Sequence, residues 1–260
     1  MILISITIWN ALAFSLLMLA IIPKYYAESY ILIFAGIALF CLLLSISLKK
    51  QAVRDFAPAT YACFGFMALS IAIYGYAGLP NAYLLLVLES FLVVSMAIWF
   101  RSKIIVVANA FLFVFILLAY LVTSESIDSV NFAIAFTALA TARILNWRKE
   151  RLTLKGEIYR NIYLLIGCLM LLYSLNNILP SNYVTLAWTA VAFGFFFLSI
   201  LLHNIKYRYL SILTIAVTAG HLFFIDLGQM EIGYRVVAFI VFAVISLGLS
   251  LYYTKRMKKK

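Results

Sequence analysis

The sequence predicts an all-α, polytopic membrane protein of about ten transmembrane helices in hairpins, with both termini in the cytoplasm. The first observation is the composition, which is 67% hydrophobic and 11% charged with a mean hydropathy of +1.10. Soluble domains are nearer half apolar and a quarter charged. The second is that the apolar residues fall into about ten stretches of membrane-spanning length. The third is that basic residues collect in every second turn.

The apolar stretches form a single integral membrane domain over residues 1–260. Each is close to the roughly 20 residues that a helix needs to cross about 30 Å of hydrocarbon. Helices are expected because lipid leaves open backbone groups unpaired, and the short alternating strands of a membrane barrel are missing from the sequence. The first stretch follows no basic residue, so it is interpreted as a retained span and not as a signal peptide. The predicted spans are 2–22, 30–48, 56–78, 82–100, 104–123, 129–147, 160–178, 183–202, 208–226 and 233–253.

Basic and charge-poor turns alternate along the chain. All lysines and arginines except Lys24 and Arg235 lie in the turns after even-numbered spans, near the span ends that flank those turns, or in the tail. This is the positive-inside pattern, and it predicts a bacterial cytoplasmic (inner) membrane protein whose basic side is cytoplasmic. The net charge of +11 therefore indicates topology and not nucleic-acid binding. The tail residues expected to contact anionic lipid are Lys255, Arg256, Lys258, Lys259 and Lys260.

Polar residues inside the spans are few, and each is expensive in a bilayer. Glu89 is the one acid well inside a predicted span. Asp226 and Arg235 flank one short turn at the predicted outer side, and His221 precedes them. These four residues form a candidate intramembrane polar site. One interpretation is a proton- or ion-linked site, or an anionic-headgroup site at Arg235. The other is a salt bridge that fixes the last hairpin.

Catalytic and metal-binding signatures are missing from the sequence, which contains no HExxH, GxSxG, P-loop or GxGxxG motif. No catalytic residue, cofactor or metal is therefore predicted. The two histidines, His203 and His221, fall on opposite predicted sides of the membrane. The three cysteines lie inside apolar stretches without ligand spacing, and buried hydrophobic roles are expected for Cys41, Cys63 and Cys168.

The C-terminal run YRYLSILTIAVTAGHLFFIDLGQMEIGYRVVAFIVFAVISLGLSLYY carries a resemblance. Arg208 opens a span that ends in Phe-Ile-Asp at Asp226, and Arg235 opens a last span rich in Phe and Gly. This pattern resembles the end of a large bacterial multi-pass membrane protein family (domain of unknown function 2339), over roughly the last 50 residues. His221 stands where that family leads us to expect a lysine. The resemblance implies a many-helix fold but does not indicate which activity the protein has.

Two functions from different classes follow. The first is a transporter or flippase subunit for a small or lipid-linked solute, favoured by the short loops and by Glu89. The alternative is a non-catalytic membrane scaffold or partner subunit of another membrane protein, favoured by the scarcity of buried polar groups. A lipid-modifying enzyme is the least supported class. The expected partners are the lipid bilayer and another membrane protein, with no nucleic acid.

Overall fold

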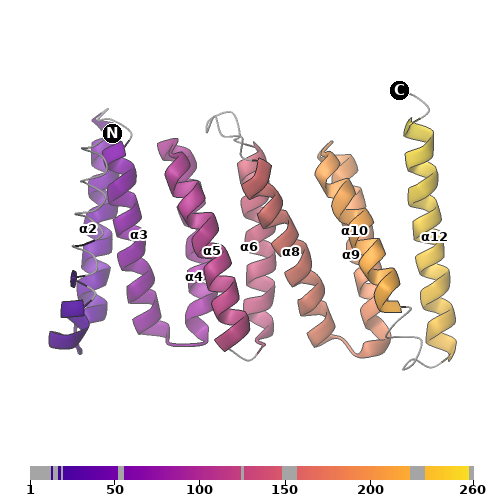
Figure 1. The fold of residues 1–260 in the computed structure, drawn as a ribbon, viewed down its shortest axis with the longest axis horizontal. Helices are drawn as coiled ribbons and strands as arrows, with labels where there is room; N and C mark the ends of the chain where they lie inside the picture. The colour runs from indigo at the N-terminus through magenta and orange to yellow at the C-terminus, as the bar shows by residue number, and fades with distance from the viewer. Residues whose placement is uncertain are drawn as a thin grey trace. The chain divides into compact units, whose positions relative to one another are not determined.

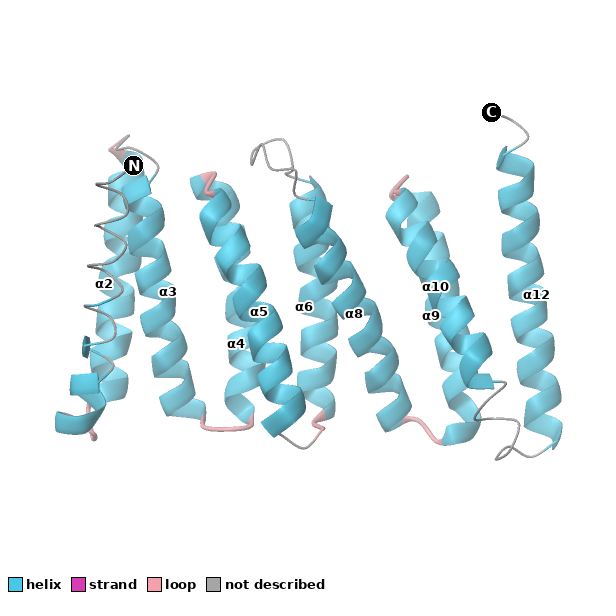
Figure 2. Cartoon of the chain, viewed as in Figure 1, coloured by secondary structure: helices cyan, strands magenta, loops and turns pink. Residues whose placement is uncertain are grey.

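The computed structural model describes residues 13, 17–18, 20–51, 56–123, 126–147, 157–222 and 232–257. Within these ranges the chain is helical and contains no strand (Figures 1 and 2). Seven of the described helices, α2 to α6, α8 and α9, are long and apolar enough to cross a membrane. The helices are α2 (Tyr30–Lys50), α3 (Phe56–Ala77), α4 (Asn81–Phe100), α5 (Lys103–Thr123), α6 (Asp128–Trp147), α8 (Glu157–Ile178), α9 (Ser181–Leu201), α10 (Ile205–His221) and α12 (Ile232–Met257).

The helix bounds agree with most of the predicted spans to within three residues. Two differences concern charged or polar ends. Helix α8 begins at Glu157, three residues before the predicted span, and α12 continues to Met257 in the basic tail. The structure describes α10 over Ile205–His221, whereas the prediction was 208–226. Most of the predicted span 2–22 lies outside the described residues, so the count of ten remains a prediction.

The helices belong to two compact units. The first comprises Met1–Glu125 and Phe136–Tyr163, and the second comprises Ser126–Ala135 and Leu164–Lys260. In the first unit α2 packs on α3, α3 on α4 and α4 on α5, as antiparallel neighbours in chain order (Figure 1). In the second unit α9 packs on both α10 and α12.

Small residues bring α2 and α3 close together. A Cβ atom on Gly65 would lie 2.8 Å from Cγ of Leu42, so the glycine is needed for this approach. Ala38 of α2 and Ala68 of α3 belong to the same buried core cluster. In lipid, helices associate largely through such close packing, because the surrounding tails are as apolar as the side chains.

Large apolar side chains cover the outer faces of the helices. Leu32, Phe111 and Phe115 are 77%, 70% and 69% exposed. Soluble monomers rarely expose apolar surface in large contiguous patches. These side chains suit contact with lipid, and together with the long apolar helices they indicate a membrane protein.

The basic turns of the first unit lie at one end of its helices. Lys49 and Lys50 close α2 at the same end as the turn of Arg101 and Ser102 between α4 and α5, while the turn at residues 78–80 lies at the other end (Figure 1). The structure thus reproduces the predicted alternation of turns in this unit. Which end faces the cytoplasm stays a prediction.

The turn between α4 and α5 is closed by backbone hydrogen bonds. Arg101 adopts a left-handed conformation with φ 56° and ψ 29°. Its N–H donates to the carbonyl oxygen of Ile98 at 3.2 Å, and the N–H of Ser102 donates to that of Ala97 at 3.0 Å. This is a Schellman motif, in which a left-handed residue lets the last helical carbonyls find donors. It fixes a two-residue connection between the helices.

Candidate functional site

Glu89 lies near the middle of α4. It follows Asn81, the first residue of the helix, by eight positions, which places it roughly 12 Å from that end at 1.5 Å per residue. Its side chain is only 5% exposed. The one acid that the sequence placed inside a span therefore points into the protein and not into lipid.

The Glu89 carboxyl has one hydrogen-bond neighbour among the described residues. The hydroxyl oxygen of Ser70, on α3, lies 2.9 Å from Oε2 of Glu89. The other oxygen, Oε1, is buried and has no hydrogen-bond partner. No ion pair of Glu89 occurs in the part of the chain that the structure describes. A carboxylate buried in this way makes few interactions that could replace those with the water that it loses.

A second polar group surrounds Asn109 of α5. Its Nδ2 donates to Oγ of Ser90 at 2.8 Å and to the hydroxyl oxygen of Tyr163 at 2.9 Å, and it lies 3.3 Å from the carbonyl oxygen of Ser90. The Tyr163 ring also packs on Phe113, with centroids 5.1 Å apart. Asn109 Oδ1 is buried and lacks a partner. The group joins α4, α5 and the start of α8 within the first unit.

The two polar groups originate from adjacent residues of α4. Successive residues of a helix point about 100° apart, so Glu89 and Ser90 point in different directions from the same level. The Glu89 side chain contacts α3, and Ser90 contacts α5. Helix α4 thus carries the polar contacts to both of its neighbours in chain order.

Sequence reasoning identified Glu89, but it missed Ser70, Ser90 and Tyr163. Serine and tyrosine are frequent in these spans, and the sequence does not show which of them face a neighbouring helix. The available signal was the adjacency of Ser90 to the single intramembrane acid. The Asn109–Tyr163 contact, between residues 54 positions apart, depends on tertiary packing.

His221 takes part in aromatic packing in the second unit. Its ring lies on that of Trp188, with centroids 4.7 Å apart and planes at 55°. The indole N–H of Trp188 donates to the carbonyl oxygen of Leu172 at 3.0 Å. Glu89 belongs to the first unit, so the structure describes no site that contains both residues.

The remaining predicted site residues lie wholly or partly outside the described residues. Asp226 falls in the gap 223–231. The backbone of Arg235 belongs to α12, but its side chain is not described. The same holds for Lys255 and Arg256, and Lys258, Lys259 and Lys260 lie beyond the described ranges. The Asp226–Arg235 salt bridge and the lipid contact of the tail therefore stay predictions.

Buried hydroxyl groups of the second unit mostly bond to their own helices. Thr189 donates to the carbonyl oxygen of Thr185 at 2.7 Å, and Thr218 donates to that of Thr214 at 2.7 Å. Ser211 of α10 donates to the carbonyl oxygen of Ala192 of α9 at 2.8 Å. These contacts stabilise helix packing and leave the hydroxyls occupied, so they indicate structure and not a ligand site.

The described residues contain no group of three or more His, Cys, Asp and Glu side chains that could hold a metal ion. Cys41, Cys63 and Cys168 are free thiols. Cys168 is buried, with Sγ 3.4 Å from Oγ1 of Thr214. The chemistry available around Glu89 is therefore that of one carboxyl group beside neutral hydroxyl and amide groups of the described residues.

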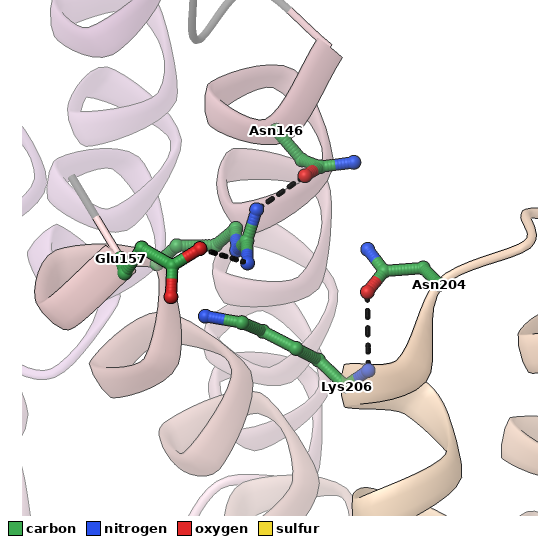
Figure 3. Close-up of polar contacts among 5 residues, drawn as sticks. Asn146, Glu157, Asn204 and Lys206 are labelled. Atoms are coloured by element: carbon green, nitrogen blue, oxygen red, sulfur yellow. Dashed lines mark hydrogen bonds and ion pairs between the residues drawn. The ribbon is translucent and has the colours of Figure 1, made fainter. Parts of the chain in front are cut away.

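Polar side chains also meet at the basic end of α6 and α8. Arg160 is 8% exposed, and its guanidinium contacts Oδ1 of Asn146 on α6 and Oε1 of Glu157 on its own helix (Figure 3). Figure 3 also shows the amide oxygen of Asn204 accepting from the backbone N–H of Lys206 at 3.1 Å, a cap that begins α10 in the second unit.

No family model matches the chain, and neither a curated protein nor a solved structure is similar to it. The resemblance of its C-terminal run to the bacterial multi-pass family stays a prediction.

Proposed function

We propose that this chain is a transporter or flippase subunit for a small or lipid-linked solute, and that Glu89 couples movement of the solute to a proton. The observation that carries the proposal is the buried Glu89 carboxyl in the middle of α4, with one oxygen lacking any hydrogen-bond partner. Intramembrane acids are expensive and commonly mark ion pathways or proton relays.

The hydrogen count around Ser70 supports a proton on Glu89. The Ser70 oxygen lies 3.0 Å from the carbonyl oxygen of Phe66 and 2.9 Å from Oε2 of Glu89. Its hydroxyl has one hydrogen to donate, and both neighbours are acceptors when the carboxyl is ionised. A proton on Oε2 makes both contacts hydrogen bonds, because Glu89 then donates to Ser70 while Ser70 donates to Phe66.

Loss of that proton changes the contact between α3 and α4. Ser70 must then turn its hydrogen to Glu89 and give up the Phe66 carbonyl, while Oε1 remains a buried charged oxygen without a donor. That state is favoured only if water or a cation reaches the carboxylate. Protonation thereby biases the packing of α4, which is the property that a coupling residue needs.

The neighbouring group of Ser90, Asn109 and Tyr163 supplies neutral hydrogen-bonding atoms at the same helix. Asn109 Oδ1 is a buried acceptor without a donor. A solute hydroxyl or amide could donate to it without bringing a charge into the membrane. Because Ser90 follows Glu89 directly on α4, a movement that follows proton loss also moves this group.

We further propose that the membrane is the bacterial cytoplasmic membrane, with both termini and the basic ends of the helices on the cytoplasmic side. The support is the sequence pattern of basic turns, together with their placement at one end of the helices in the first unit.

The test uses the full-length protein in liposomes that contain a pH-sensitive dye. Pools of sugars, amino acids and nucleosides are added outside, and movement of fluorescently labelled phospholipid is followed by chemical quenching of the outer leaflet. The parent should move a solute or lipid together with protons. Glu89→Gln keeps the shape and mimics the protonated carboxyl, so it should abolish coupled movement.

Glu28→Gln is the matched control, since Glu28 is an exposed acid of the same unit. It should behave like the parent. If Glu89→Gln couples like the parent, or if the parent moves nothing beyond empty liposomes, the proposal is wrong.

The alternative is a non-catalytic partner subunit of another membrane protein. It is favoured by the second unit, in which the hydroxyls of Thr189, Thr214 and Thr218 bond to carbonyl oxygens of their own helices. Under this alternative Glu89→Gln is silent in the liposome assay, and the protein instead co-purifies with a defined membrane partner.

A further inference from the structure

Arg160 is a buried cation at the basic end of the first unit. It lies in the first turn of α8, and its side chain is 9% exposed. One guanidinium nitrogen donates to Asn146, a neutral acceptor, and another lies 3.4 Å from Oε1 of Glu157. The Glu157 side chain is 73% exposed. Solvent screens an ion pair of this kind, so Glu157 compensates little of the buried charge.

The Arg160 guanidinium also has an unused donor. Its Nε atom is buried and has no hydrogen-bond partner. Arginine carries five N–H donors in a planar fork, and a buried donor without an acceptor is unfavourable. Among the described residues, the Glu157 carboxylate contacts Nη2, so Nε is left without an acceptor that carries negative charge.

Arg143 adds a second cation to the same helix pair. It precedes Asn146 by three residues on α6, so the two lie on one face, with Arg143 one turn deeper. Arg143 is half-buried, and it has no hydrogen bond or ion pair with the described residues. Facing parts of α6 and α8 thus hold two arginines and one exposed carboxylate.

The geometry points to a phosphate-binding site formed by Arg143 and Arg160 between the basic ends of α6 and α8. Planar guanidinium groups match phosphate oxygens and bind them through paired, charge-assisted hydrogen bonds. The N-terminus of α8 adds its positive pole at the same end. Arg143 lies four residues from Trp147, the end of α6, or roughly 6 Å along the axis.

The phosphate has two possible sources, the headgroup of an anionic phospholipid and free phosphate. Glu89 takes no part in this site, which is formed by other side chains of the first unit.

The test measures lipid retained by the purified full-length chain in neutral detergent, using native mass spectrometry with added phosphatidylglycerol or phosphatidylcholine. The parent should retain phosphatidylglycerol in preference to phosphatidylcholine. Arg143→Gln should lower this retention roughly tenfold, the effect of losing a charge-assisted contact. Lys50→Gln removes an exposed charge at the same end of the same unit and should leave retention unchanged.

Glu157→Gln provides a result of opposite direction. It removes the carboxylate that competes for Arg160, so phosphatidylglycerol retention should rise. A site that only clamps the α6–α8 hairpin predicts no rise. Arg160→Lys keeps the charge but loses the planar fork, and should bind more weakly than the parent. Because Arg160 variants alter a buried contact, Arg143→Gln and Glu157→Gln decide the question if an Arg160 variant does not fold.

Added inorganic phosphate separates the two sources, with chloride at equal ionic strength as the control for screening. Displacement of phosphatidylglycerol by phosphate alone identifies free phosphate as a ligand of the site. Retention that phosphate does not reduce, but that still falls in Arg143→Gln, identifies the lipid headgroup. Equal retention of the two lipids, or parent-like retention in both Arg143→Gln and Glu157→Gln, overturns the inference.

Discussion

The hydroxyl oxygen of Ser70 lies 2.9 Å from Oε2 of Glu89, joining α3 to α4 in the middle of the first unit. It is the one hydrogen bond of that carboxyl among the described residues, since Oε1 has none. Burial of an acid in a membrane is unfavourable, and among the described residues Glu89 has a single neutral hydrogen-bond partner.

Replacement of Ser70 by alanine should lower the free energy of unfolding by about 0.5–1.5 kcal/mol, the range for one neutral hydrogen bond. The measurement is reversible unfolding in mixed micelles, followed by circular dichroism. Ser95→Ala is the matched control, because Ser95 is a half-buried serine of α4 that donates only to the carbonyl oxygen of Phe91 at 2.9 Å. Equal losses for the two variants would show that the Ser70–Glu89 contact adds nothing.

Tyr163→Phe should cost about 0.5–1.5 kcal/mol, because it removes the hydroxyl that Asn109 contacts while its ring can still pack on Phe113. Asn109→Leu should cost more, since Ser90 also loses its donor. The double variant should cost less than the sum, because both changes remove the same contact. Tyr61→Phe, at a 39% exposed position, is the control and should be near neutral. Strict additivity of the two changes contradicts this view.

The predicted topology of the chain can be tested by cysteine labelling. In a chain without its three native cysteines, Lys50→Cys and Glu157→Cys lie at the basic end and should resist a membrane-impermeant maleimide in intact cells. Asp128→Cys, in the first turn of α6, should label from outside. Permeabilised cells provide the control, since all three positions should then react. Labelling of Lys50→Cys in intact cells would reverse the predicted orientation.

The predicted Asp226–Arg235 salt bridge can be tested by measuring the unfolding of single and double variants. Removal of one partner should cost a few kcal/mol if the pair is buried and less if it is wet, because it leaves an unpaired charge. The double substitution should recover part of the loss. If the single and double variants unfold like the parent, the two side chains do not interact.

The sequence predicted the helices better than their ends. Apolar length defines a span, so α4 and α5 begin within one residue of their predicted starts. Helix α8 begins earlier than predicted because Glu157 is charged and was assigned to the loop, yet an acid is favourable in the first turn of a helix. Helix α10 also begins before its predicted span, since the amide oxygen of Asn204 caps its first turn.

The candidate site could be predicted only in part. Glu89 could be identified because acids are rare in membrane spans, and an acid in a span is expected to be buried away from lipid. Its neighbour Ser70 could not be predicted, because a serine 19 positions away faces Glu89 only when α3 and α4 pack in one rotation. Arg160 was read as one more topogenic charge, since the sequence gives no sign that Asn146 accepts from it.

The Schellman turn at Arg101 has a mechanical consequence. The connection has only two residues, and their backbone donors are already bonded, so the end of α4 is tied directly to the start of α5. The Ser90–Asn109 contact joins α4 to α5, whereas the Ser70–Glu89 contact joins α4 to α3. If α4 and α5 move together, the Ser90–Asn109 contact is kept and the Ser70–Glu89 contact is the one that must break.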